Sequence, residues 1–151
     1  MKQESKARRM VHVLLRPGFG AALLAAQFLS RRQSLFSKSG YLVALGALLI
    51  ATSVWLWLAA SVHCSRASRP GEVATSGPYA IIRHPIYSSV LLLGAGLGLL
   101  FFSWLHLLVV VASIPLWWLE GKSEEEDMTR AFGSTYADYQ RRTAMLIPGI
   151  L

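Results

Sequence analysis

Charged residues are scarce in this chain of 151 residues. Only 15% of the sequence is Asp, Glu, Lys or Arg, and 54% is hydrophobic, whereas about a quarter of the residues in an average soluble domain are charged. So few polar side chains cannot cover a compact fold in water. The composition therefore argues against an ordinary soluble domain and favours a protein that places much of its surface in a lipid bilayer.

Cysteine is almost absent, because Cys64 is the only one in the sequence. A single cysteine cannot close an internal disulfide, and it forms no zinc-binding spacing with the histidines. We therefore expect no disulfide, no metal site and no thiol redox chemistry. We interpret His12, His63 and His106 as packing or interface residues.

Acidic residues are fewer than basic ones, which gives a formal net charge of +7. In a soluble protein this excess would suggest a nucleic-acid partner. Here the basic residues lie between apolar stretches, where they set orientation and contact anionic lipids. The expected partner is therefore the membrane, and no nucleic acid is expected.

Long apolar stretches predict an all-α integral membrane protein, with residues 1–151 forming a single domain. The run 41–63 carries no charge and, at about 1.5 Å per residue, is long enough to cross a hydrocarbon layer of roughly 30 Å. The uncharged run 87–119 is too long for one crossing and predicts a helical hairpin with its turn near Ser103. The prediction is about four transmembrane helices, including this C-terminal hairpin, followed by a short cytoplasmic helical segment; the spans are 10–29, 41–63, 87–102 and 105–120.

The basic residues allow an orientation to be predicted. With four spans, eleven of the fifteen lie on one side of the membrane, and such an excess marks the cytoplasmic side. The same side holds two polar segments, 64–86 before the hairpin and 121–151 after it. The hairpin would bring these segments together, so we expect the functional site there, facing the cytoplasm of a bacterial inner membrane.

The first polar segment ends in Arg83-His84-Pro85, which has the features of a helix start. Proline is favoured in the first turn of a helix and pushes the preceding residue out of the α region. A helix start attracts anions, and the Arg83 guanidinium adds a full positive charge. Tyr79 and Tyr87 flank this corner with aromatic rings. The alternative is that Arg83 and His84 simply lie at the lipid headgroups and Tyr87 is a residue of the aromatic belt.

The second polar segment contains the acidic run 123–127. Ser123 and Glu126 have capping-box spacing, which predicts that a helix begins at Ser123, and Gly133 is a candidate for the residue that ends it. Acidic residues beside anionic lipid are unfavourable unless they pair with a cation or bind a ligand. The alternative is that they only stabilise the helix start through its dipole.

Several motifs follow one another in the order Gly77-Pro78-Tyr79, Arg83-His84-Pro85-x-Tyr87, Glu124-Glu125, Phe132-Gly133-x-x-Tyr136-x-x-Tyr139, Arg142 and Pro148. This order resembles the isoprenylcysteine carboxyl methyltransferase family and its phospholipid methyltransferase relatives. The resemblance covers residues 75–148, about half of the chain. It departs from the family after the last arginine, where Thr143-Ala144 replaces the usual Val-Pro.

The resemblance implies an S-adenosylmethionine-dependent membrane methyltransferase that acts on a lipidic or prenylcysteine-like acceptor. The residues expected to bind the cofactor are Tyr79, Arg83, His84, Pro85, Tyr87, Glu124 and Glu125. Tyr136, Tyr139 and Arg142 are expected to bind the acceptor, and Arg142 and Glu125 are the candidate catalytic residues. Two alternatives are an NAD(P)H-dependent membrane reductase on a related scaffold and a non-catalytic subunit that packs through Gly94 and Gly98.

Overall fold

A computed structural model describes residues 6–30, 39–66 and 72–149, with side chains for 17–29, 39–65 and 72–149. All of its regular elements in these ranges are helices, which confirms the predicted all-α class. Ile82 and Ala144 form one isolated parallel bridge. The elements are α1 (Lys6–Ser30), α2 (Gly40–Arg66), the 3₁₀ helix η1 (Gly77–Ala80), α3 (Pro85–Leu100), α4 (Trp104–Phe132) and α5 (Ser134–Arg142).

Within the described ranges, two helices are long and apolar enough to cross a bilayer, Gly40–Ser65 in α2 and Trp104–Phe132, which is α4. The stretches Pro17–Leu29 and Pro85–Leu100 are shorter apolar helices. Many apolar side chains of α2 are exposed, among them Leu48, Trp55 and Leu58, as expected for a surface that faces lipid. The four-span topology stays a prediction.

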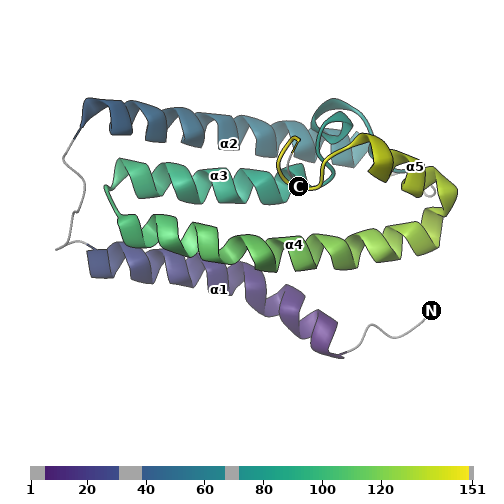
Figure 1. Ribbon diagram of the computed structural model, residues 1–151, viewed down its shortest axis with the longest axis horizontal. Helices are drawn as coiled ribbons and strands as arrows, with labels where there is room; N and C mark the ends of the chain where they lie inside the picture. Colours follow the sequence, from purple (N-terminus) through teal and green to yellow (C-terminus); the bar gives the residue numbers. More distant parts are fainter. Residues whose placement is uncertain (1–5, 31–38, 67–71, 150–151) are drawn as a thin grey trace.

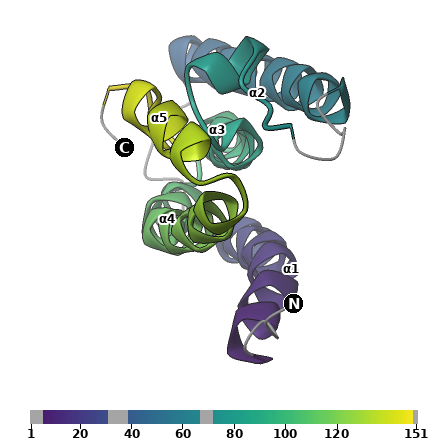
Figure 2. The same ribbon diagram turned by 90° about the vertical axis from the view of Figure 1, so that its right-hand side faces the viewer.

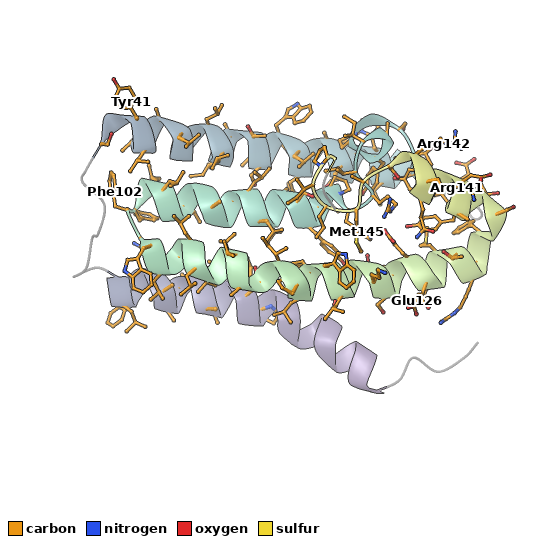
Figure 3. All side chains as sticks on the ribbon, in the orientation of Figure 1. Tyr41, Phe102, Glu126, Arg141, Arg142 and Met145 are labelled. Atoms are coloured by element: carbon orange, nitrogen blue, oxygen red, sulfur yellow. The ribbon has the colours of Figure 1, made fainter. Side chains whose placement is uncertain are left out.

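The long helices lie side by side in the order α2, α3, α4, α1 (Figure 1), and each contacts its neighbour in that row. The view along the bundle shows α5 crossing one end, next to α4 and α3 (Figure 2). Tyr41 and Phe102 lie at the opposite end from Glu126 and Arg142 (Figure 3). The labelled charged residues are therefore gathered at the end that α5 covers.

Small residues let α3 approach both of its neighbours closely. A Cβ atom on Gly96 would lie 2.9 Å from the Gly46 carbonyl oxygen of α2, and one on Gly94 would lie 2.7 Å from Val110 Cγ2 of α4. In addition, Ser53 Oγ donates a hydrogen bond of 2.7 Å to the Ser89 carbonyl across the α2–α3 contact. These contacts hold α3 closely between α2 and α4.

The hairpin turn lies where the sequence predicts it. Phe101, Phe102 and Ser103 separate α3 from α4, and Phe102 adopts a left-handed conformation with φ of 54°. Ser103 is the N-cap of α4, and its hydroxyl accepts a hydrogen bond of 3.2 Å from the His106 backbone. The chain can thus reverse direction within three residues.

The predicted helix start at Ser123 is wrong. Helix α4 continues without a break from Trp104 through Pro115 and Ser123 to Phe132. A capping box acts only where the chain enters a helix from an extended conformation, and here Ser123 is already inside one. Gly133, with φ of 57°, does end the helix as predicted. The acidic residues therefore lie on the last turns of a helix that begins at the other end of the bundle.

Candidate active site

The start of α3 is built as the sequence predicts. His84 is the N-cap residue, with φ of −119° and ψ of 61°, and Pro85 occupies the first turn. Pro85 is fully buried, and it needs no partner because it has no N–H group. This arrangement places Arg83 and His84 just before the positive end of the α3 dipole.

The chain after α5 returns to this helix start and pairs with it. We call residues 143–148 the C-terminal segment. Three backbone hydrogen bonds join it to the residues before α3: Arg83 N–H to the Ala144 carbonyl (2.8 Å), His84 N–H to the Met145 carbonyl (3.1 Å) and Ala144 N–H to the Ile81 carbonyl (3.1 Å). The third bond requires an N–H group at position 144. Proline, the usual residue at this position in the family that the motifs resemble, has no N–H group and could not make this bond, whereas Ala144 can.

Arg83 is a junction between α3, α4 and α5. Its Nε donates a hydrogen bond of 2.5 Å to Glu125 Oε1 on α4. Its Nη1 donates to the carbonyl oxygens of Gln140, at 3.0 Å, and of Thr143. The second Glu125 oxygen accepts a hydrogen bond of 3.0 Å from the Gln140 amide. Because the Arg83 and Glu125 side chains are only 11% and 8% exposed, this is a buried and internally satisfied pair.

His84 and Tyr87 connect this pair to Glu124. His84 Nδ1 lies 3.5 Å from Glu124 Oε2, and His84 Nε2 lies 3.3 Å from Glu125 Oε1. The rings of His84 and Tyr87 are stacked, with centroids 5.2 Å apart, and Tyr87 Oη donates a hydrogen bond of 2.5 Å to Glu124 Oε1. We call Arg83, His84, Glu124 and Glu125 the charged corner.

The charged corner shifts the pKa values of its members in opposite directions. Burial lowers the pKa of His84, but the Glu124 and Glu125 carboxylates raise it by more, so the net shift is upward. Burial raises the pKa of Glu125, but neighbouring His84 and Arg83 lower it by more. Both shifts favour a protonated His84 beside an ionised Glu125.

Three tyrosines close the corner from η1 and α5. Tyr139 Oη donates a hydrogen bond of 2.7 Å to the Tyr79 carbonyl, and the rings of Tyr136 and Tyr139 meet edge to face with centroids 5.6 Å apart. Burial raises the pKa of Tyr79 and Tyr136, and raises that of Tyr139 to about 12. These phenols therefore stay protonated at neutral pH and act as hydrogen-bond donors, not as bases.

The structure brings most of the predicted site residues together, with one exception. Arg142 is exposed, and its Nε donates to the Asp138 carbonyl within α5 (3.1 Å). It does not join the charged corner. Glu124 is the most accessible member of the corner, with 39% of its side chain exposed. A ligand that reaches this corner would therefore meet Glu124 before the buried Arg83–Glu125 pair.

Several residues of the site were not predicted from the sequence. Gln140 and Thr143 hold Arg83 largely through backbone carbonyl groups, which carry no side-chain signal. Trp117 packs on Tyr87 from α4, with ring centroids 5.0 Å apart, although in sequence it lies within an apolar run like any lipid-facing tryptophan. Gly121 allows His84 to approach α4, because a Cβ there would lie 3.2 Å from His84 Nε2 and 2.7 Å from Met145 Cε. The one signal in the sequence for this role of Gly121 was its position, one helical turn before the paired glutamates.

Comparison with known proteins places this arrangement in a family. Methanethiol S-methyltransferase 2 of Bradyrhizobium diazoefficiens is 35% identical over 77 residues, which are 46% of this chain and 26% of that protein. The chain therefore matches about a quarter of the length of this relative. The model of the phospholipid methyltransferase family matches residues 18–135, a range that includes α3, the hairpin and both glutamates of the charged corner. The chain belongs to the phospholipid methyltransferase family.

Proposed function

We propose that the chain is an S-adenosylmethionine-dependent methyltransferase whose cofactor binds at the charged corner. The observation that carries this proposal is Glu124, an accessible carboxylate held in place by Tyr87 and His84 beside a buried ion pair. Such a carboxylate fits an ammonium group or ribose hydroxyls, and the nearby start of α3 fits a carboxylate. A cofactor that carries both groups suits a corner with both kinds of partner.

The contacts suggest a division of labour within the corner. The Arg83 donors are directed to Glu125, Gln140 and Thr143, so Arg83 and Glu125 act as positioning residues. Glu124, His84 and Tyr87 are the residues proposed to touch the cofactor. Tyr79 and Tyr139 would close the corner from the side of η1 and α5. Pro85 contributes by fixing the first turn of α3.

The bound cofactor would supply an electrophilic methyl group on a sulfonium. Transfer to a nucleophile disperses charge in an in-line displacement, so alignment in a site that excludes water contributes more than acid–base catalysis. The protonated tyrosines and the His84–Glu125 pair agree with such a mechanism, because at neutral pH each of these groups is either protonated or engaged in an ion pair.

The first candidate acceptor is lipidic or prenylcysteine-like, as the resemblance of the motifs implies. The second is a small thiol, which two observations favour. The relative named above is a methanethiol S-methyltransferase. In addition, α3 is in direct contact with both neighbours at Gly46, Gly96 and Gly94, so a long acyl chain would have to lie on the outer surface of the bundle.

The proposal can be tested by calorimetric titration of the purified protein with S-adenosylmethionine and, separately, with NADPH. We expect binding of S-adenosylmethionine only. Glu124→Gln should weaken that binding by about tenfold, the value of one charge-assisted hydrogen bond. The matched control is Glu126→Gln, because Glu126 lies on the same helix but is 55% exposed and pairs with Arg130. Binding of NADPH alone, or equal affinities for both variants, would contradict the proposal.

A further inference from the structure

Trp117 belongs to a continuous series of aromatic contacts that leads from the charged corner toward α1. His84 stacks on Tyr87, and the Tyr87 ring lies 5.0 Å from that of Trp117. Trp117 then meets Phe19 of α1 edge to face, with centroids 5.6 Å apart. We call Tyr87, Trp117 and Phe19 the aromatic series. It connects the corner with the contact between α1 and α4.

The indole N–H of Trp117 has no hydrogen-bond partner in the part of the chain that the structure describes. Trp117 is only 2% exposed, so water does not satisfy this donor. A buried tryptophan N–H usually finds a partner, and leaving it without one is unfavourable. The neighbouring Trp118 differs from Trp117, because it is only partly buried. The Lys122 ammonium lies over its ring. An unsatisfied donor beside a candidate active site therefore points to a ligand atom.

The hydrogen bonding of helix α1 is interrupted close to the aromatic series. Pro17 lies inside α1, two residues before Phe19, and removes one backbone hydrogen bond of the helix. Toward its N-terminus the ribbon of α1 slants away from α4 (Figure 1). Phe19, the α1 member of the aromatic series, thus lies beside a turn of the helix that lacks one backbone hydrogen bond.

We propose that Trp117 and Phe19 form the acceptor side of the site, with the Trp117 N–H donating a hydrogen bond to the nucleophilic atom of the methyl acceptor. This inference rests on the proposed function and deepens it by naming the acceptor class. An N–H donor in apolar surroundings stabilises an anion more than a neutral atom. The acceptor is therefore a thiolate or a carboxylate on an apolar body, not an amine.

The reaction balances without a catalytic base from this chain. The acceptor loses its proton to water and is held as the anion by Trp117. Its sulfur or oxygen forms the new bond to the methyl carbon while the bond between that carbon and the sulfonium sulfur breaks. The electron pair of the broken bond stays on that sulfur, which leaves as a neutral thioether.

The test compares Trp117→Phe with Trp118→Phe in purified protein. Three acceptor probes are used: ethanethiol, N-acetyl-S-farnesylcysteine and vesicles that contain phosphatidylethanolamine. We expect methylation of the thiol or the carboxylate probe, a KM for that probe raised about tenfold in Trp117→Phe, and an unchanged Kd for S-adenosylmethionine. Trp118→Phe should match the unsubstituted protein in both quantities.

Three results would overturn the inference. An unchanged acceptor KM in Trp117→Phe would show that the N–H does not contact the acceptor. An equal loss of cofactor affinity would show that the ring only packs against the corner. Methylation of the amine lipid alone would contradict the anionic class. If S-adenosylmethionine does not bind the unsubstituted protein, the proposed function itself fails, and the titration distinguishes this case from the other three.

A second variant keeps the inference testable if Trp117→Phe does not fold. Phe19→Leu shortens the side chain that ends the aromatic series on α1. If this residue borders the acceptor, the variant should shift the preference among straight-chain alkanethiols toward longer chains, with cofactor affinity unchanged. An unaltered preference would overturn the assignment of Phe19 and Trp117 to the acceptor.

Discussion

Arg83 looks like a ligand-binding residue in the sequence, but its contacts in the structure are internal. Its guanidinium joins the Glu125 carboxylate of α4 to carbonyl oxygens at the end of α5 and in the C-terminal segment. The fork of a guanidinium can serve several acceptors in fixed directions, which a lysine ammonium cannot do. Its main effect is therefore on the assembly of the charged corner.

Arg83→Ala is expected to destabilise the protein strongly, because it leaves the Glu125 carboxylate buried without its cation. Loss of one partner of a buried pair costs roughly 3–5 kcal/mol. The measurement is the free energy of unfolding in mild detergent. Arg142→Ala is the matched control, since Arg142 is exposed and bonds only within α5 among the described contacts, and it should change stability by less than about 0.5 kcal/mol. Similar losses for the two variants would contradict the assigned role of Arg83.

His84 should make stability depend on pH. The carboxylates of Glu124 and Glu125 raise its pKa above the unfolded value despite burial. The stabilisation by protonated His84 is therefore fully present below the unfolded pKa and is lost as the pH rises through the folded pKa. The pKa of Glu125 is lowered. Its contribution to stability is therefore present above its unfolded pKa and is lost as the pH falls through the folded pKa.

Unfolding midpoints measured across neutral and alkaline pH will test this expectation. The midpoint of the unsubstituted protein should fall as His84 loses its proton, and His84→Gln should remove that fall while keeping a polar side chain of similar length. Glu126→Gln serves as the control that leaves the titration intact. The same fall in His84→Gln would assign the pH dependence to another group.

The fit of α3 between its neighbours decides where the charged corner lies. Gly96 faces the backbone of α2, where the Gly46 carbonyl oxygen and the Ile50 backbone nitrogen would lie 2.9 and 3.1 Å from a Cβ atom on Gly96. Backbone atoms cannot move aside as a flexible side chain can. Any side chain at this position must therefore separate the two helices.

Gly96→Ala is accordingly expected to destabilise the protein by about 1–3 kcal/mol, the usual range for overpacking. Gly18→Ala is the matched control, because no atom of the described residues outside the nearby backbone of α1 lies within 4 Å of its Cβ position. The control should be neutral or slightly stabilising, since alanine favours a helix more than glycine does. Both variants are compared by thermal unfolding, and a stable Gly96→Ala would mean that α2 and α3 are not closely packed.

Local chemistry decides which of these elements can be predicted from the sequence. Proline after His84 and glycine at 133 act on the backbone itself, so the start of α3 and the end of α4 were predicted correctly. The helix start predicted at Ser123 was wrong, because the spacing of a capping box carries no information on whether the preceding residues are already helical. The return of the C-terminal segment to α3 rests on backbone hydrogen bonds, which almost any sequence can make.

Across the molecule as a whole, the charged side chains that the structure describes gather at one end of the helical bundle. The charged corner, α5 and the C-terminal segment lie at the end that also holds Arg141, Arg142 and Glu126 (Figure 3). Helix α3 leads from this end to the hairpin turn, and α4 leads back to it. The polar segments before and after the hairpin therefore meet at the same end. Under the proposed function, this arrangement would let the cofactor enter from water at the charged corner, while the helices contact the bilayer.

The orientation of the molecule in the membrane can be tested with its single cysteine. Cys64 is exposed near the end of α2 that leads to η1 and the charged corner. Tyr41, 89% exposed, lies at the other end of the same helix. The 27 residues of α2 extend about 40 Å at about 1.5 Å per residue, enough to place these two positions on opposite sides of a bilayer.

We predict that a membrane-impermeant maleimide labels Cys64 only in inverted vesicles, where the cytoplasmic face is outside, because the excess of basic residues marks that face. Cys64→Ser should abolish the labelling. Tyr41→Cys in the Cys64→Ser background should restore it only in vesicles of the native orientation. Labelling of both positions from one side would show that α2 does not span the membrane. Labelling in the reversed pattern would put the charged corner on the outer face, where a cofactor made in the cytoplasm cannot reach it.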